Sequence, residues 1–351
     1  MLSSKLYLDD LNKIHASIKN IDSLNHRHIF ITGATGLIGS ALVDYLLYLI
    51  TVKKFDLKIT IGVRNIDKAY KRFGQFINKN YLNYILFDAT QSVNLSGAYD
   101  YIVHAASPAN PAEFSSVPVD TMLSNLISLN SLLDYAKNQK VKKLIYVSSS
   151  EVYGIKGDSK PYRETEYGYL DILNERACYP SAKRAAETLC VSYANQYGVD
   201  VSIVRPGHIY GPTASDRDNR ASSQFFYDVI YGHDIVMKSK GEQKRSYCYV
   251  LDCLSSIITV LLNGKNKCAY NISNPNSICS IYELACCIAK YANRKVVFEA
   301  ATDKEKRSYN LMSNSSLDST LISELGWVGL FDINTGVEHT LKILKEFGQY
   351  E

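Results

Sequence analysis

The stretch HIFITGATGLIGSALVDYLLYLI, residues 28–50, places a short apolar strand, a glycine-rich turn and an apolar helix in immediate succession. Gly33, Gly36 and Gly39 give the turn the spacing G-x-x-G-x-x-G. The first glycine permits a tight turn, the second lets a pyrophosphate approach the backbone, and the third lets the helix pack closely on the strand. The phosphates then rest on the helix N-terminus. A purely structural turn is the alternative, but the strand–turn–helix order favours a dinucleotide site.

Apolar strands alternate with helical segments through the rest of the first 205 residues. Further strands are expected at 57–65, 83–90, 99–107, 141–150 and 199–212. Strands alternating with helices predict right-handed βαβ units, and hence an α/β fold built on a Rossmann-type, doubly wound parallel sheet. Beyond about residue 206, Gly, Pro, Asn and Ser become frequent. This change predicts a smaller C-terminal α/β domain that binds the substrate over the carboxyl edge of the sheet.

Three regions are therefore expected. Residues 1–27 form a helical N-terminal extension, because Leu8, Leu11, Ile14 and Ile18 recur at helical spacing. Residues 28–205 form the dinucleotide-binding domain. Residues 206–351 form mainly the substrate domain, with some segments returning to the first.

Composition narrows the class of protein. With 351 residues that are 46% hydrophobic, the chain can bury a large core. A formal charge of +4 without a long basic run gives no support for nucleic acid or a membrane as partner. The apolar run ALVDYLLYLI is too short to span a bilayer and is interrupted by Asp44. Eight scattered cysteines without a metal-ligand spacing suit free thiols in a reducing compartment, so a cytoplasmic protein without a metal site is expected.

A tyrosine and a lysine stand four positions apart in ACYPSAKRAAE, residues 177–187. Residues at i and i+4 share one face of a helix. Lys183 would then lower the pKa of Tyr179, stabilise its phenolate and hold the nicotinamide ribose, because an unassisted tyrosine is a poor base at neutral pH. Ser149, at the end of the preceding strand, would hydrogen-bond the same substrate oxygen. Chance packing is the alternative, and the upstream glycine turn disfavours it.

The dinucleotide would contact the ends of the first four strands. Arg64 follows the second strand, where a carboxylate would indicate NAD and an arginine can face the 2′-phosphate of NADP. Asp88 follows the third strand and would meet the adenine edge, although a strand-ending aspartate is the simpler explanation. The complete expected cofactor set comprises Gly33, Thr35, Gly36, Leu37, Ile38, Gly39, Arg64, Asp88, Ala89, Ala105, Ala106, Ser107, Tyr179 and Lys183.

The chain resembles the extended short-chain dehydrogenases/reductases of the nucleotide-sugar epimerase/dehydratase family. The motifs that carry the resemblance are GATGLIG, HAASPA, SSSEVYG, YPSAK, RPGHIYGP and GEQKRSYCYVLD. The resemblance covers roughly residues 28–345. It implies NAD(P), with NAD favoured, a nucleoside-diphosphate sugar as substrate, oxidation at sugar C4, and a homodimer built on helices near 120–137 and 180–196.

The step after C4 oxidation depends on Ser150 and Glu151. Hexose 4,6-dehydratases of this family commonly carry two acids here, whereas Ser-Glu resembles the UDP-glucuronate decarboxylases. Oxidising C4 of a hexuronate makes a β-keto acid, which loses CO2 readily. Glu151 would then manage protons at the sugar ring and Arg245 would face the carboxylate, with Ser150 and Arg220 as further substrate contacts. Arg245 as a general diphosphate clamp is the alternative.

Other outcomes stay open at this stage. A 4,6-dehydratase, a 4-epimerase and an NADPH-dependent 4-keto-6-deoxysugar reductase are compatible with the motifs, the last because of Arg64. A non-catalytic dinucleotide-binding module is disfavoured by the intact Ser149, Tyr179 and Lys183. His104 and His208 are expected to be packed or bonded to the backbone rather than catalytic.

Overall fold

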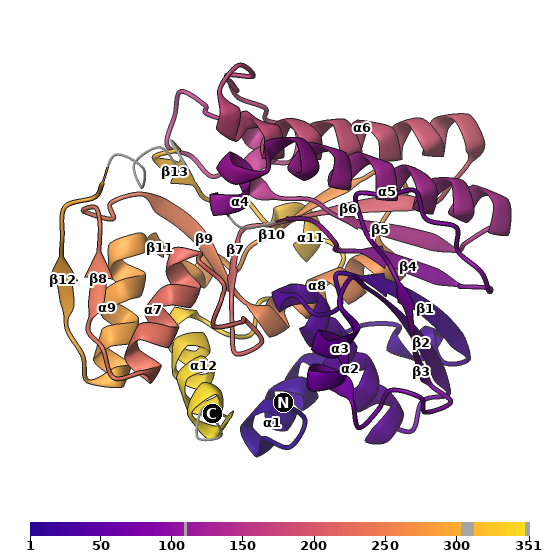
Figure 1. Ribbon diagram of the computed structural model, residues 1–351, viewed down its shortest axis with the longest axis horizontal. Coiled ribbons are helices and arrows are strands. Elements are labelled where there is room, and N and C mark those ends of the chain that lie inside the picture. Colours follow the sequence, from indigo (N-terminus) through magenta and orange to yellow (C-terminus); the bar gives the residue numbers. More distant parts are fainter. Residues whose placement is uncertain (109–110, 303–311, 348–351) are drawn as a thin grey trace.

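A seven-stranded parallel sheet forms the centre of the molecule in the computed structural model, which describes residues 1–108, 111–302 and 312–347 (Figure 1). The strand order is β10-β6-β5-β4-β1-β2-β3, and every neighbouring pair is parallel. Its strands are β1 (Arg27–Thr32), β2 (Leu57–Val63), β3 (Leu82–Leu86), β4 (Tyr101–His104), β5 (Lys143–Val147), β6 (Val201–Pro206) and β10 (Ala269–Ile272). The predicted α/β doubly wound fold is confirmed.

Helices cover both faces of this sheet, as buried parallel strands require. On one face lie α5 (Pro118–Gln139) and α6 (Cys178–Tyr197), which pack along each other (Figure 1). On the other face lie α2 (Leu37–Thr51) and α8 (Val250–Asn263), which are also in contact. Strand β1 and helix α2 are buried almost throughout, which explains the long apolar run in the sequence.

The small sheets come mainly from the C-terminal part of the chain. Strand β9 (Lys244–Tyr249) pairs with β7 (His208–Tyr210), β11 (Ile278–Ser280) and β13 (Asn314–Ser315), and β8 (Ile235–Met237) pairs with β12 (Val296–Phe298). The segment 199–212, expected as one strand, is divided at Gly207 between the large sheet and β7. A side chain at Gly207 would collide with the backbone of Ser246, which lies on β9.

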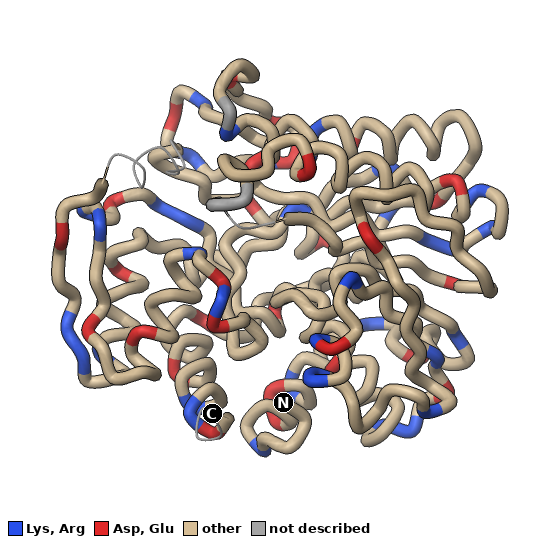
Figure 2. Tube along the Cα trace, in the orientation of Figure 1, with Lys and Arg blue, Asp and Glu red and all other residues tan. Residues whose placement is uncertain are grey.

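The remaining elements complete the two parts. The helices are α1 (Lys5–Ser17), α3 (Ile66–Phe73), α4 (Pro111–Ser116), α7 (Ala221–Ile230), α9 (Ile281–Ala292), α11 (Thr320–Ser323) and α12 (Ile333–Phe347). Short 3-10 helices are η1 (Ile21–Leu24), η2 (Ser150–Tyr153), η3 (Glu175–Ala177) and η4 (Pro275–Ser277). Lysine, arginine and acidic residues alternate over the whole trace (Figure 2).

The N-terminal helix α1 is fastened to both parts of the molecule. The Tyr7 hydroxyl donates to Asp44 on α2 at 3.1 Å. Asp10, which is buried, accepts from the Tyr249 hydroxyl at the end of β9 at 3.3 Å and lies 2.9 Å from His339 Nδ1 on α12. Helix α1 spans Lys5–Ser17 of the N-terminal segment. It closes the core beside α8 and α12.

Candidate active site

The glycine turn between β1 and α2 has the backbone shape that a dinucleotide needs. Gly33 has φ +69°, and a Cβ there would lie 2.5 Å from the carbonyl oxygen of Ala105. A Cβ at Gly39 would collide with Gly33 itself, so the third glycine is needed for close packing of helix on turn. At Gly36 a Cβ would meet only the Gly33 carbonyl, at 3.3 Å, which leaves the outer side of the turn open.

Helix α2 begins directly at this turn, and no side chain caps its N-terminus. Its first backbone N–H groups are therefore directed toward the open side of the turn, as in sites that bind pyrophosphate. The residues present fit a dinucleotide.

A cavity of about 590 Å³ extends from the glycine turn across the carboxyl edge of the sheet to the small sheets. We refer to it as the catalytic cavity. Predicted site residues that line it are Gly33, Gly36, Leu37, Ile38, Gly39, Ala105, Ser107, Ser149, Ser150, Glu151, Tyr179, Lys183, Arg220 and Arg245. The structure thus brings together segments that lie up to about 200 residues apart in the sequence.

Tyr179 and Lys183 lie on one face of α6 at the centre of the catalytic cavity. The Tyr179 ring stacks on Phe114, with ring centroids 4.4 Å apart, and Ser149 is one of the groups that lower the pKa of its hydroxyl. Lys183 Nζ lies 5.7 Å from the centroid of the Tyr179 ring and donates to the Val147 carbonyl at 2.9 Å. Both side chains are buried. This arrangement can move a proton to or from a substrate oxygen.

Burial changes the proton affinities of the pair in a direction that the sequence did not predict. Removal from water raises the pKa of Tyr179, and the hydrogen bond from Ser149 lowers it by less. Burial also lowers the pKa of Lys183 to about 7, against a raising effect of Glu187. The expected acidic tyrosine is therefore not what this structure shows, because burial disfavours phenolate and ammonium alike.

Glu151 is held by an arginine that sequence reasoning did not single out. Arg176, from η3, donates two hydrogen bonds to the Glu151 carboxylate, at 3.0 and 2.9 Å. The two side chains are only 14% and 17% exposed. Such a two-point contact fixes the plane of the carboxylate beside Ser149 and Tyr179. The tripeptide Glu-Arg-Ala before the tyrosine motif was the available signal.

The two expected substrate arginines differ in their partners. Arg220 forms an ion pair with Asp218, two residues earlier, and Asp218 also accepts from Ser223. Arg245 is 3% exposed and donates to the backbone carbonyls of Lys244 and Met312, at 2.9 and 2.8 Å. Within the described part of the chain, Arg245 has no carboxylate within ion-pair distance, and burial lowers its pKa. A buried guanidinium of this kind favours an anionic ligand.

Five expected cofactor residues, Thr35, Arg64, Asp88, Ala89 and Ala106, do not line the catalytic cavity, although they belong to the same edge of the sheet. Arg64 is exposed directly after β2. Asp88 accepts two hydrogen bonds from Thr90, which lower its pKa, and Arg64 lowers it further. The Ala106 N–H donates to Thr32 Oγ1 at 3.2 Å.

His104 and His208 have different surroundings. His104 is buried, and its ring nitrogens lie 2.7 Å from Thr32 Oγ1 and 3.3 Å from Ser128 Oγ, so its predicted structural role agrees with the structure. His208 instead lines the catalytic cavity, together with Asn219, Gln243 and Tyr247. These four residues lie on loops and short strands, which offer no periodic signal.

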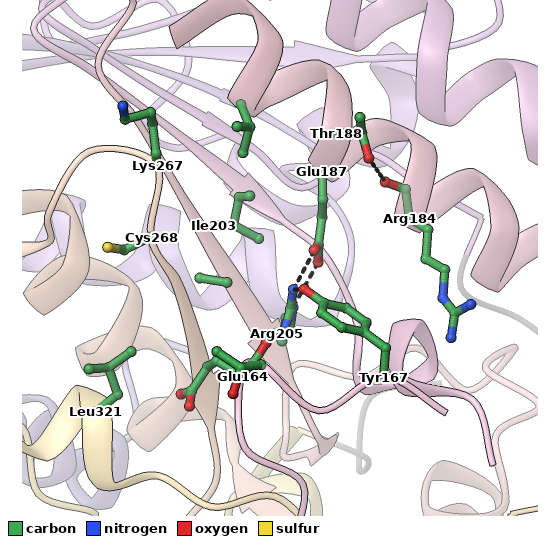
Figure 3. Close-up of a pocket in the computed structure, with 13 residues that line it drawn as sticks. Glu164, Tyr167, Arg184, Glu187, Thr188, Ile203, Arg205, Lys267, Cys268 and Leu321 are labelled. Atoms are coloured by element: carbon green, nitrogen blue, oxygen red, sulfur yellow. Dashed lines mark hydrogen bonds and ion pairs between the residues drawn. The ribbon is translucent and has the colours of Figure 1, made fainter. Parts of the chain in front are cut away.

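A second cavity, of about 620 Å³, is lined in part by Arg184, Glu187 and Thr188 of α6 (Figure 3). Its polar centre is a buried ion pair in which Arg205 donates to Glu187 at 2.9 and 2.6 Å. Arg205 also donates to the hydroxyls of Tyr153 and Tyr167 and to the Glu164 carbonyl. The guanidinium is thereby fully occupied by the protein, so this cavity is not the candidate active site.

Two further observations concern the described residues as a whole. Their histidine, cysteine and acidic side chains form no cluster that could hold a metal ion. None of their helices has the length and apolarity needed to cross a membrane.

Comparisons with known proteins agree with this geometry. UDP-glucuronic acid decarboxylase 3 of Arabidopsis thaliana is 30% identical over 270 residues, which cover 76% of this chain and 75% of that protein. UDP-glucuronic acid decarboxylase 1 of Xenopus tropicalis is 28% identical over 336 residues, covering 94% and 75%. The chain is thus similar to such decarboxylases over most of its length.

Solved structures show the same fold at lower identity. An epimerase of Methanothermobacter thermautotrophicus superposes with a TM-score of 0.79 at 16% identity, covering 98% of this chain and 97% of that one. A dTDP-glucose 4,6-dehydratase of Streptomyces venezuelae, with NAD bound, gives 0.77 at 22% identity, covering 92% and 99%. The sequence model of the NAD dependent epimerase/dehydratase family matches residues 29–273. The chain therefore belongs to the NAD dependent epimerase/dehydratase family.

Proposed function

We propose that the protein decarboxylates a UDP-hexuronate such as UDP-glucuronate after oxidation of the sugar at C4. The observation that carries the proposal is the meeting of Ser149, Glu151, Tyr179 and Lys183 with the buried Arg245 around one cavity that begins at the glycine turn. The similarity to UDP-glucuronic acid decarboxylases over most of the chain supports the same reaction.

The glycine turn and the open N-terminus of α2 would hold the pyrophosphate of NAD. NAD, when bound, accepts the hydride that leaves C4 of the sugar. Tyr179, with Ser149 beside it in the cavity, would take the proton of the C4 hydroxyl, so that loss of proton and hydride together makes C4 a ketone. Lys183, four residues further on α6, lies 5.7 Å from the centroid of the Tyr179 ring and would hold the nicotinamide ribose.

The carboxylate at C6 is then β to a ketone. The C5–C6 bond breaks, CO2 leaves, and the electron pair passes to an enolate across C5, C4 and the C4 oxygen. Arg245 would first bind the carboxylate and then face this enolate, because it is the buried arginine of the cavity without an acidic partner among the described residues. Glu151, oriented by Arg176, would take up a proton from water and deliver it to C5.

Arg64 bears on the choice of dinucleotide. The family is NAD dependent, and solved relatives contain NAD, which favours NAD here. Arg64 is nevertheless exposed where a 2′-phosphate could approach it. We expect NAD to support turnover, and a comparison of initial rates with NAD and NADP measures the preference directly.

The reaction is tested by incubating the purified protein separately with UDP-glucuronate and NAD, with nucleotide hexoses and NAD, and with a nucleotide 4-keto sugar and NADPH, and following products by mass spectrometry. Loss of CO2 supports the proposal. Loss of water from a nucleotide hexose would replace it with 4,6-dehydration. An altered retention time at unchanged mass would replace it with epimerisation, and gain of two hydrogens by a 4-keto sugar with NADPH would replace it with reduction.

We further propose a homodimer in the cytoplasm, formed through α5 and α6. The first turns of α5 expose Val119, Met122 and Leu123, at 65%, 38% and 42% of their surface. Exposed apolar residues on one helix favour burial against a partner. Light scattering coupled to size-exclusion chromatography should give twice the chain mass for the wild type and the single mass for Leu123→Glu.

A further inference from the structure

Arg184 follows Lys183 on α6 but extends beside the second cavity, which it lines (Figure 3). Its guanidinium donates to three backbone carbonyls: Val152 at 2.6 Å, Tyr153 at 3.1 Å and Gly168 at 3.0 Å. The planar, forked guanidinium has enough donors to bind three such acceptors at once. Arg184 thus joins α6 to the backbone of two other segments of the chain.

The first two acceptors lie at the end of the short helix η2. The last carbonyls of a helix have no partner inside it, and a basic side chain can bond to them. At its other end, η2 begins at Ser149, whose Oγ accepts from the Glu151 N–H at 3.2 Å. The helix that carries Ser150 and Glu151 at the catalytic cavity is therefore bonded to α6 at its far end.

The third acceptor, Gly168, belongs to a segment that pairs with the chain just after η2. Ile155 and Tyr169 exchange two backbone hydrogen bonds, both of 2.8 Å. A Cβ at Gly168 would lie 2.3 Å from the Ile155 carbonyl oxygen, so this close approach requires glycine. The segment continues into η3, which supplies the arginine that holds Glu151. Arg184 thus bonds both η2 and the segment that leads to the partner of Glu151.

Two parts of the chain supply the proposed reacting side chains. Tyr179 and Lys183 come from α6, whereas Ser149 and Glu151 come from the start of η2. Proton transfer needs hydrogen-bond reach between these groups and the substrate, so a shift of one part against the other lowers turnover. We propose that Arg184 is a positioning residue that holds η2 at its working distance from α6. The proposal rests on the proposed function in taking these four side chains as the reacting set.

Steady-state rates of CO2 release from UDP-glucuronate test this role. Arg184→Ala should lower kcat by roughly 10²-fold, the effect of a small displacement of reacting groups. KM and the affinity for UDP, measured by titration calorimetry, should stay within about twofold of wild type, because Arg184 does not line the catalytic cavity. Arg184→Lys keeps the charge without the planar fork, so it should also lose turnover. Thr188→Ala, one turn further on α6 and in the wall of the same cavity, is the control and should keep the wild-type kcat.

Three results of these measurements would overturn the proposal. The first is a kcat of Arg184→Ala within about twofold of wild type. The second is a loss of UDP affinity as large as the loss of kcat, which would indicate general damage to the cavity. The third is wild-type turnover in Arg184→Lys, which would show that positive charge alone suffices.

Hydrogen exchange of the ligand-free protein measures the positioning without any reaction. The amides of Ile155 and Tyr169 should exchange faster in Arg184→Ala than in the wild type or Thr188→Ala, at a temperature where circular dichroism shows all three folded. Unchanged exchange would overturn the proposal even if turnover falls. Should the wild type release no CO2 from UDP-glucuronate, the proposed reaction fails, and the exchange experiment still decides whether Arg184 holds this segment.

Discussion

Two cavities of nearly equal volume are lined by different residues of α6, and their polar groups differ. In the second cavity, Arg205 satisfies its guanidinium with Glu187, Tyr153, Tyr167 and the Glu164 carbonyl (Figure 3). In the catalytic cavity, Arg245 has no described acidic partner, and one buried side-chain atom in each of His208, Asn219 and Gln243 has no hydrogen-bond partner. Volume does not distinguish the two. Unmet hydrogen bonding and unpaired charge do, because a folded chain retains them chiefly where a ligand will satisfy them.

Helix α6 belongs to both cavities and separates them. Tyr179 and Lys183 line the catalytic cavity, whereas Arg184 and Thr188 line the second. Glu187 lies between the two sets: it pairs with Arg205 and also accepts from Ser148 at 2.6 Å. Ser148 directly precedes Ser149, for which a catalytic role is proposed. Through Glu187, the ion pair with Arg205 thus holds α6, the helix that carries the proposed proton-transfer pair.

Of the substitutions at the two cavities, Tyr179→Phe should cause the largest loss of turnover. The ring keeps its stack on Phe114, but the hydroxyl that exchanges a proton with the sugar is lost. Turnover should fall by roughly 10²–10⁴-fold, the usual contribution of general acid–base catalysis. The Tm should stay at the wild-type value. Turnover that survives the substitution would place the chemistry elsewhere.

Arg205→Met, in contrast, should lower the free energy of unfolding. Removing one partner of a buried pair leaves Glu187 charged and uncompensated, which costs about 3–5 kcal/mol. Urea unfolding followed by circular dichroism measures the free energy of unfolding. Thr188→Ala, in the wall of the same cavity, is the control and should change it little. A loss below about 1 kcal/mol for Arg205→Met, the median of exposed pairs, would contradict the bracing role.

Lys183→Met tests whether Lys183 is buried on the side of α6 that faces the catalytic cavity. The measurement is the free energy of unfolding as a function of pH. The pKa of Lys183 is about 7 in the folded protein and close to 10.5 when exposed. Between these values the unfolded chain binds more protons, so stability rises with pH, by up to about 1.4 kcal/mol per pH unit. The wild type should therefore gain stability over Lys183→Met from pH 7 to pH 10. A difference that is constant with pH would show that Lys183 is not buried as described.

Asp10→Asn tests whether helix α1 stabilises β9, the strand that carries Arg245. Asp10 joins α1 to Tyr249, at the end of β9, and to His339 on α12. Weakening this buried contact should lower the free energy of unfolding by about 1–3 kcal/mol. Asp9→Asn, exposed on the same helix, is the matched control. Equal stability of the two variants would mean that α1 does not brace this wall.

Thr188→Trp should have the smallest effect. A large side chain at the rim of the second cavity reduces its volume without touching the catalytic one. Turnover should stay within about twofold of wild type, as for an exposed substitution away from the site. A tenfold fall, read against an unchanged Tm, would show that the second cavity takes part in function and would remove the distinction drawn above.

Local patterns explain which parts of this molecule could be predicted. The role of Gly39 and the shared face of Tyr179 and Lys183 depend on neighbours within one turn or helix, and the sequence contains that information. The large sheet was predicted except for β10, a four-residue strand that returns from the C-terminal part of the chain. The division of segment 199–212 at Gly207 was not predicted, because a single apolar run forms both β6 of the large sheet and β7 of a small sheet.

The rest depends on distant contacts and on burial. Arg176 meets Glu151 across 25 residues, and His208 reaches the cavity only because β7 leaves the large sheet. The direction of the Tyr179 pKa was predicted wrongly because spacing reveals the lysine but not the loss of water around both groups. The positions of Arg176 and His208 and the burial of Tyr179 can be known only from the folded structure, in which distant segments form the walls of the cavity.

Deuterium substitution in UDP-glucuronate tests the central claim most directly. Oxidation at C4 must break the C4–H bond before CO2 can leave, whereas the C5–H bond is not broken on the way to decarboxylation. The initial rate of CO2 release should therefore fall with deuterium at C4 and be unchanged with deuterium at C5. A rate that falls with deuterium at C5 and not at C4 would contradict the account, because carbon dioxide would then be lost without a ketone at C4.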